Sequence, residues 1–260
     1  MIYLKTDKEI SVIRQGGRIL SDILAELVGL SKPGANTADI DARAEKLMRQ
    51  AGGEPAFKGY RGSGGAKPFP CTICASINGE VVHGLAVPAR ELKDGDLFKI
   101  DIGLRYKELY TDMAATVGIG EISKEAERLR RSTKEALLIG LGKVKPGAWI
   151  SDIGKAVDKY VRRQDYSTVK DLVGHGVGKY VHEEPQIPNY FDSAAEPVLI
   201  EPGMVLAIEP MVNAGEDAVR VLSDGWTVVT ADKSLSAHFE ATIAVTADGA
   251  EIMTPLVEGV

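Results

Sequence analysis

The sequence repeats one arrangement of segments, and this repeat limits the folds that the chain can adopt. A Lys-Pro-Gly-Ala turn stands between two helical patterns at residues 32–35 and again at residues 145–148, and an Asp-Ile pair follows each turn. Three further similarities occur in the same order: residues 82–83 resemble 181–182, residues 94–101 resemble 202–209, and residues 111–117 resemble 239–245. Four similarities in one order are hard to ascribe to chance, so we expect a chain built from two related halves.

Capping residues mark where the helices of these halves begin. Thr6 and Glu9 have the form of a capping box at the start of the first helix, and Ser123 caps the helix that precedes the second turn. Further predicted elements are a helix over Thr37–Gln50 and a hairpin of strands Leu97–Gly103 and Leu109–Gly118. No linker rich in Pro or Ser divides the halves. We predict a single α+β domain over residues 1–260, with antiparallel strands meeting at the centre and helices covering one side.

Composition indicates an ordinary globular protein. Hydrophobic residues make up 44% of the chain and charged residues 26%, which is typical of a protein with a full-sized core. The net charge of −6 argues against a nucleic-acid partner, because proteins that bind phosphate backbones usually carry a basic excess. The N-terminus lacks the pattern of a secretory signal, and no apolar run approaches the roughly 20 residues that span a membrane. We therefore expect a cytoplasmic protein with no membrane contact.

The chain has two cysteines, Cys71 and Cys74, which form a Cys-x-x-Cys pair. A structural zinc site usually takes four ligands, so one pair is too few. A thioredoxin-type site needs a strand-to-helix context, whereas this pair lies in a segment flanked by proline. We interpret both residues as ordinary buried or pocket thiols.

Several acidic residues lie in segments that otherwise look like buried strands. Asp101, Glu209 and Glu240 each have apolar, β-branched neighbours, and carboxylates rarely enter a core without a partner. Asp101 and Asp112 stand on either side of a turn predicted near residues 106–107, which would place the two carboxylates directly opposite each other. Each acid taken alone could be a solvent-facing or ion-paired residue. Together, on related strands of related halves, they favour a metal site.

The four histidines strengthen this interpretation. His175 lies in a glycine-rich stretch over residues 174–178, where the backbone can pack closely around a site. A phosphate-binding loop is excluded, because Lys179 is followed by Tyr180 rather than by Ser or Thr. His83 would pass for a structural residue were it not the first-half counterpart of His182.

A site of four carboxylates and one imidazole is rich in oxygen. Such a set suits manganese, iron or cobalt, with zinc also accommodated. Bridging carboxylates hold two such ions roughly 3.5–4 Å apart.

The chain resembles the type I methionine aminopeptidases, which have the pita-bread fold of two pseudo-symmetric halves with a central antiparallel sheet and outer helices. The resemblance covers nearly the whole chain. It rests on an Asp-Ile-Gly motif with a second Asp eleven residues after the first, the motif around His175 with His182-Glu-Glu-Pro, Ile208-Glu209-Pro210, and residues 234–237 ahead of Glu240.

The resemblance implies two divalent ions and a set of residues that hold them. The implied ligands are Asp101, Asp112, His175, Glu209 and Glu240. It further implies that His182 hydrogen-bonds the scissile amide, that His83 helps to handle the peptide, and that Glu209 moves a proton from water to the leaving amine.

The same matching implies a pocket for the methionine side chain. Its residues would be Phe57, Tyr60, Phe69, Cys74, Val181 and Trp226. For Phe57 and Val181, an ordinary core role is an equal alternative.

Three departures from the family pattern affect this region. Val181 stands where the family commonly has Phe, Gly62–Lys67 looks like a small insertion, and His238 stands where a Gln or another polar residue is commoner. We interpret His238 as a structural histidine, the alternative being a hydrogen-bond partner of a metal ligand.

The implied activity is removal of the initiator methionine from nascent polypeptides, with a small uncharged second residue preferred. The implied setting is a monomer that acts on nascent N-termini, with the ribosome as a further partner. Two alternatives stay open: an Xaa-Pro peptidase with the same metal site, and a catalytically silent binding relative.

Overall fold

The computed structural model describes residues 1–62, 67–193 and 196–260. Most of the insertion predicted at Gly62–Lys67 therefore lies outside the described residues. In the described part of the chain, no helix is long and apolar enough to cross a membrane.

The first half begins with two helices, as predicted. α1 (Asp7–Leu30) starts at the capping box of Thr6 and Glu9. Its buried residues recur at helical spacing and include Ile10, Ile13, Leu20, Leu24 and Leu27. α2 (Thr37–Gln50) has the predicted bounds and is capped by Asn36. Amphipathic spacing and capping chemistry therefore account for this half of the helical layer.

The second half repeats this arrangement with α3 (Lys124–Leu141), capped by Ser123, and α4 (Ile150–Arg163). The two Lys-Pro-Gly-Ala turns also have matching geometry. Gly34 has φ +85° and its N–H donates to Leu92 O, while Gly147 has φ +78° and its N–H donates to Ile200 O. Glycine is required because these turns need a positive φ. The repeat in the sequence is thus a repeat in the structure.

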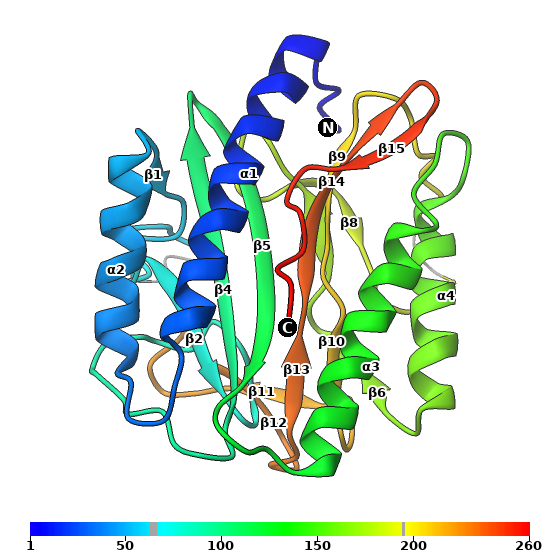
Figure 1. Ribbon diagram of the computed structural model, residues 1–260. Coiled ribbons are helices and arrows are strands. Elements are labelled where there is room, and N and C mark those ends of the chain that lie inside the picture. Colours follow the sequence, from blue (N-terminus) through cyan, green and yellow to red (C-terminus); the bar gives the residue numbers. More distant parts are fainter. Residues whose placement is uncertain (63–66, 194–195) are drawn as a thin grey trace.

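A nine-stranded sheet joins the two halves. Its main path runs β1 (Glu54–Pro55), β4 (Leu97–Tyr106), β5 (Leu109–Gly118), β14 (Glu240–Thr246), β9 (Val205–Ile208), β7 (Gly174–Gly176) and β8 (Glu183–Ile187). β2 (Ile73–Ile77) pairs with β4, and β15 (Gly249–Ile252) pairs with β14. All these pairings are antiparallel, and the halves meet where β5 lies beside β14. Figure 1 shows the four long helices on one side of this sheet, with the C-terminal segment running between α1 and α3.

Two three-stranded sheets complete the fold. One consists of β13 (Ser236–His238), β10 (Met211–Asn213) and β6 (Ser167–Thr168). The other consists of β11 (Val219–Val221), β12 (Val228–Thr230) and β3 (Glu80–Val82). β3 ends directly before His83, and β12 begins two residues after Trp226. The pairing of β3 with β12 therefore brings a segment of each half to the same place.

One predicted register is wrong. Asp101 lies opposite Ala114, and Asp112 lies opposite Gly103, so the two carboxylates are diagonal neighbours rather than a direct pair. The cause is the turn, which consists of Lys107 and Glu108, both with positive φ, one residue later than predicted. A later turn moves the pairing by two residues, which keeps both carboxylates on the same face of the sheet.

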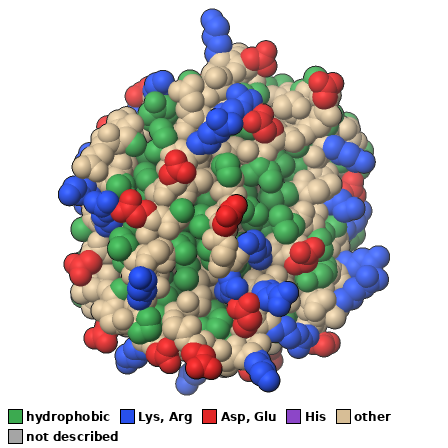
Figure 2. All heavy atoms as spheres, viewed as in Figure 1, with side chains coloured by type: hydrophobic (Ala, Val, Ile, Leu, Met, Phe, Trp, Pro, Cys, Tyr) green, Lys and Arg blue, Asp and Glu red, His purple; other side chains and the backbone are tan. Residues whose placement is uncertain are grey.

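The surface seen from the helical side carries both signs of charge. Lys and Arg side chains are interspersed with Asp and Glu over this face, and no histidine is visible there (Figure 2). All four histidines lie in the described residues, so their site must open elsewhere.

Candidate metal centre

Three adjacent strands deliver three carboxylates to one point. Ala114 on β5 pairs with Asp101 on β4 and with Glu240 on β14, and Asp112 lies two residues before Ala114 on the same face. The small side chain of Ala114 leaves space between the acids. The β5–β14 contact therefore joins carboxylates from both halves.

The second half adds His175 on β7 and Glu209 directly after β9. His175 pairs with Ala207, which brings its ring next to the end of β9. His175 Nε2 lies 3.3 Å from Glu209 Oε1. All five predicted metal ligands thus lie together.

The carboxylates are buried without the partners that a charge requires. Asp101, Asp112 and Glu240 are 8%, 3% and 2% exposed. Within the described residues, Asp101 Oδ1, Asp112 Oδ1 and Glu240 Oε1 have no hydrogen-bond partner. Uncompensated buried charge is strongly unfavourable, so the cluster needs either protons or cations.

The pKa values follow from this burial. Burial raises the pKa of Asp101 to about 7, and it raises the pKa values of Asp112, Glu209 and Glu240 well above their usual range. Burial acts in the opposite direction on His175, whose pKa falls to about 3. The His175 imidazole is therefore neutral and can donate a lone pair to a metal. The four carboxylates ionise less readily than usual unless a cation is bound beside them.

Two groups of side chains have the spacing of ion ligands. One ligand atom from each of Asp112, His175 and Glu240 lies within 4.8 Å of the other two, and the same holds for Glu209, His238 and Glu240. Glu240 belongs to both groups, which is the arrangement of a carboxylate shared by two ions. Oxygen and imidazole donors fit divalent metals of the manganese-to-zinc series. Asp101 lies outside both groups among the described residues, although it lines the same cavity.

The carboxylates open into a small cavity of about 80 Å³. Its lining combines the five predicted ligands with His83, His182 and most of the predicted methionine pocket. The pocket residues that line it are Phe57, Tyr60, Phe69, Cys74 and Trp226. Val181, also assigned to the pocket, is instead buried in the hydrophobic core and does not line the cavity.

Close packing shapes the apolar end of this cavity. The Phe69 and Trp226 rings meet edge to face with centroids 5.2 Å apart. A Cβ atom on Gly103 would lie 2.7 Å from the Phe57 ring, so the glycine of the Asp-Ile-Gly motif is what lets Phe57 approach β4. Cys74 pairs with Asp101 across β2 and β4, and its thiol contacts that carboxylate. Cys71 and Cys74 are buried free thiols, as predicted.

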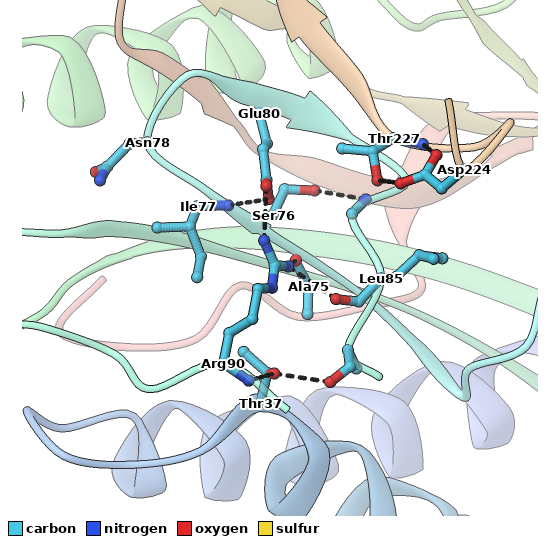
Figure 3. A network of polar contacts seen from close by, with 12 residues as sticks. Thr37, Ala75, Ser76, Ile77, Asn78, Glu80, Leu85, Arg90, Asp224 and Thr227 are labelled. Atoms are coloured by element: carbon cyan, nitrogen blue, oxygen red, sulfur yellow. Dashed lines mark hydrogen bonds and ion pairs between the residues drawn. The ribbon is translucent and has the colours of Figure 1, made fainter. Parts of the chain in front are cut away.

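His83 occupies a strained position that a polar network supports. Its φ is +58°, a conformation that costs on the order of 1–3 kcal/mol for a residue other than glycine. Arg90 donates to the carbonyls of Ala75 and Leu85 on either side of the loop and forms an ion pair with Glu80 at 2.6 Å (Figure 3). The Gly84 N–H donates to Ser76 Oγ. The loop that carries His83 is therefore anchored along its length.

Asp224 holds the turn that carries Trp226. The Asp224 carboxylate accepts hydrogen bonds from the Thr227 backbone and hydroxyl, as Figure 3 shows, and from the Trp226 N–H. This turn directs the indole toward His83, with ring centroids 6.4 Å apart.

His182 lies at the mouth of the cavity, on an exposed loop. Its Nδ1 is 2.8 Å from the Tyr60 hydroxyl. The next residue, Glu183, accepts backbone hydrogen bonds from Lys179 and Tyr180 and pairs with Lys5 in the interior. This buried pair fixes the loop, and no sequence pattern predicts it because Lys5 lies far from Glu183 along the chain.

His238 lies next to the predicted ligands. Expected to be a structural histidine, it lies with its ring 3.6 Å from Glu209 Oε2 and within the second ligand group. Its closeness in sequence to Glu240 was the available signal.

Comparison with known proteins agrees with this geometry. The sequence profile of metallopeptidase family M24 matches residues 11–247. Methionine aminopeptidase 1 of Bacillus subtilis is 45% identical over 254 residues, which cover 98% of this chain and 99% of that protein. The methionine aminopeptidase of Escherichia coli K12 is 39% identical over 97% of this chain and 94% of its own length.

Solved structures show the same relationship. The methionine aminopeptidase of Thermotoga maritima superimposes with a TM-score of 0.92 at 39% identity and covers 98% of this chain and 99% of its own. The prolidase of Pyrococcus horikoshii superimposes with a TM-score of 0.78 at 21% identity, with 65% of its chain covered. The latter similarity establishes the pita-bread fold alone.

Proposed function

The chain belongs to metallopeptidase family M24, and from this membership we propose that its centre removes the initiator methionine from nascent polypeptides. It is a metallo-aminopeptidase, as its relatives of 39–45% identity over nearly the whole chain indicate. The observation that carries the proposal is that a carboxylate and histidine cluster and an apolar, thiol-containing pocket line one and the same cavity. An Xaa-Pro specificity fits less well, because the prolidase of Pyrococcus horikoshii is only 21% identical. A silent binding role fits less well, because all five predicted ligands are present and line one cavity.

We assign the two divalent ions to Asp101, Asp112, His175, Glu209 and Glu240. Glu240 is shared, because it belongs to both ligand groups. When bound, such ions polarise the scissile carbonyl, lower the pKa of water and stabilise the charge that develops on oxygen. The donor set favours manganese, iron or cobalt, with zinc as a further candidate.

Glu209 is the residue that we assign to proton transfer. It is partly buried, with its carboxylate between His175 and His238. Burial raises its pKa well above the usual value, which suits a group that must accept a proton and release it again. It takes the proton from the attacking water and delivers it to the amine nitrogen of the leaving peptide.

His182 and His83 orient the peptide. Because the Tyr60 hydroxyl engages His182 Nδ1, we assign Nε2 to the hydrogen bond with the scissile amide. His83 lies across the cavity against Trp226 and contacts the first residue of the substrate. The side chains of Arg90 and Glu183 hold the loops that carry these two histidines.

The shape of the site explains why only one residue is removed. The inner cavity has room for a single side chain, and Phe57, Phe69 and Trp226 give it an apolar wall. The soft surface of Cys74 suits a thioether. A wider hollow of about 520 Å³ shares His83, His175, His182 and Glu209 with the inner cavity and offers the path for the rest of the peptide.

We further propose that the chain works as a cytoplasmic monomer on ribosome-borne N-termini.

The test is release of free methionine from a Met-Gly-x peptide. The protein is stripped of metal and then given manganese, cobalt, iron(II) or zinc, with an Xaa-Pro peptide as the competing substrate. We expect metal-dependent release of methionine and no cleavage of the Xaa-Pro peptide. Two ions bound with no release from either peptide would overturn the proposed substrate.

Glu209→Gln tests the proton-transfer role. The variant keeps the size of the side chain but cannot accept the proton, so we expect turnover to fall by about two to four orders of magnitude. Glu258→Gln, which removes an exposed carboxylate far along the chain, is the matched control and should keep full activity. If Glu209→Gln turned over substrate at the wild-type rate, the assignment of proton transfer to Glu209 would be wrong.

A further inference from the structure

We infer that His238 is an additional metal ligand of this centre, binding through Nε2 the ion that Glu209 and Glu240 hold. The inference rests on the proposed function in assuming a divalent ion, and it gives the centre a second nitrogen donor.

The backbone of His238 is fixed on both sides. It pairs with Met211 across β13 and β10. Its N–H donates to Thr116 Oγ1 at 2.9 Å, and the Thr116 hydroxyl donates back to its carbonyl at 2.7 Å. β5 therefore holds the His238 backbone on one edge and β10 on the other, which fixes where its Cα–Cβ bond points.

The ring is buried and has no hydrogen-bond partner. His238 is 1% exposed, and neither Nδ1 nor Nε2 is bonded to any group in the described part of the chain. A buried imidazole without partners is costly, and a histidine that merely fills a core normally bonds through at least one nitrogen. The distance of 3.6 Å to Glu209 Oε2 is too long for a hydrogen bond.

The position of the ring matches what an ion requires. One ligand atom from each of Glu209, His238 and Glu240 lies within 4.8 Å of the others. Ligand atoms bound to one ion at about 2.1 Å can lie up to about 4.2 Å apart, so shifts of a few tenths of an ångström complete the group. The nearby cation Lys99 is occupied elsewhere, because its Nζ donates to the carbonyls of Asn78 and Ser236.

A second imidazole changes which ions the centre prefers. His175 joins Asp112 and Glu240, and His238 joins Glu209 and Glu240, so each group contains one nitrogen donor. Nitrogen donors favour cobalt, nickel and zinc over manganese more strongly than carboxylates do. We therefore expect the loss of His238 to weaken cobalt binding more than manganese binding.

The experiment uses the full chain, stripped of metal and titrated with cobalt(II). Binding is measured by equilibrium dialysis, and coordination by proton NMR, in which an imidazole bound to cobalt(II) gives a strongly shifted exchangeable N–H signal. The wild-type protein should show two such signals, from His175 and His238. H238Q should show one, with cobalt affinity at least about tenfold weaker. H83Q, which alters a cavity histidine outside both ligand groups, should keep both signals.

The outcomes separate the two claims. A single shifted imidazole signal in the wild-type protein, or cobalt affinity of H238Q within twofold of wild type, would overturn ligation by His238 and leave the metal centre standing. A wild-type chain that binds no cobalt would overturn the centre and this inference together. The signal count in the wild-type protein needs no variant, so the test survives if H238Q fails to fold.

Discussion

At the scale of single residues, burial determines the chemistry of this site. It raises the pKa values of the clustered carboxylates and lowers that of His175, so the metal-free protein holds protons where the ions belong. Metal uptake must release those protons. Protons do not compete with the metal for the His175 imidazole near neutral pH, because its pKa of about 3 leaves it neutral there.

Metal affinity should therefore fall as the pH falls. Asp101, with a pKa of about 7 in place of the ordinary 3.8, is protonated below that pH and cannot then bind a cation. Between pH 8 and pH 6 we expect manganese affinity to drop by up to about tenfold per unit for each proton released. Calorimetric titration in two buffers of different ionisation enthalpy measures both quantities. Equal affinity at both pH values with no proton release would contradict the raised carboxylate pKa values.

At the scale of elements, polar anchors hold the loops that carry site residues. Arg90 contacts no predicted metal ligand, yet it bonds the segments before and after His83 (Figure 3). Thr242 plays a similar part within the sheet: its hydroxyl donates to the Asp112 carbonyl and accepts from the Asp112 N–H. Arg90 and Thr242 therefore act by positioning other residues, His83 and Asp112 respectively.

Arg90→Met should impair catalysis without removing the metal. The loop loses its bonds to Ala75, Leu85 and Glu80, so His83 is no longer held in its strained position. We expect kcat/KM to fall by about tenfold to a hundredfold. Metal content should be unchanged, and Arg90→Lys should recover part of the loss. Arg49→Met, which removes an exposed i,i+4 pair with Glu45, is the control and should have little effect. Loss of bound metal in Arg90→Met would show a wider structural role.

The packing of α1 against the C-terminal segment can be tested in the same way. A Cβ atom on Gly17 would lie 2.1 Å from the Met253 carbonyl oxygen, whereas one on Gly29 would meet nothing within 4 Å. Gly17→Ala should lower the free energy of unfolding by about 1–3 kcal/mol. Gly29→Ala in the same helix should raise it by up to about 1 kcal/mol. Urea denaturation compares the two, and equal effects would mean that α1 does not pack as described.

At the scale of the whole molecule, the centre lies where the two halves meet. Asp101 and Asp112 come from the first half, and His175, Glu209 and Glu240 from the second. An ion that binds both sets must favour the folded, joined state over any state in which the halves separate.

Metal should accordingly stabilise the whole chain. Added manganese at about a hundred times its Kd should contribute about 2.7 kcal/mol to the free energy of unfolding. Scanning calorimetry should show one transition that moves to a higher Tm with metal and returns with a chelator. Two transitions, or one that metal does not move, would indicate that the halves are not coupled through the site.

Local chemistry made much of this protein predictable from its sequence. Capping residues and amphipathic spacing gave the bounds of α1 and α2, because these signals act within a few residues. The repeat revealed two halves, since each copy keeps the glycine that its turn requires. Acids in apolar strands indicated the metal cluster, because burying a charge needs a compensating partner.

Contacts between distant segments decided the rest. The register of Asp101 and Asp112 depended on the turn at Lys107, the placement of Val181 in the core depended on packing from other elements, and the burial of the Lys5–Glu183 pair depended on the N-terminal segment. His238 comes close to Glu209 because β5 and β10 hold its backbone between them. A sequence pattern records what a residue meets along the chain, whereas these positions follow from what it meets across the fold.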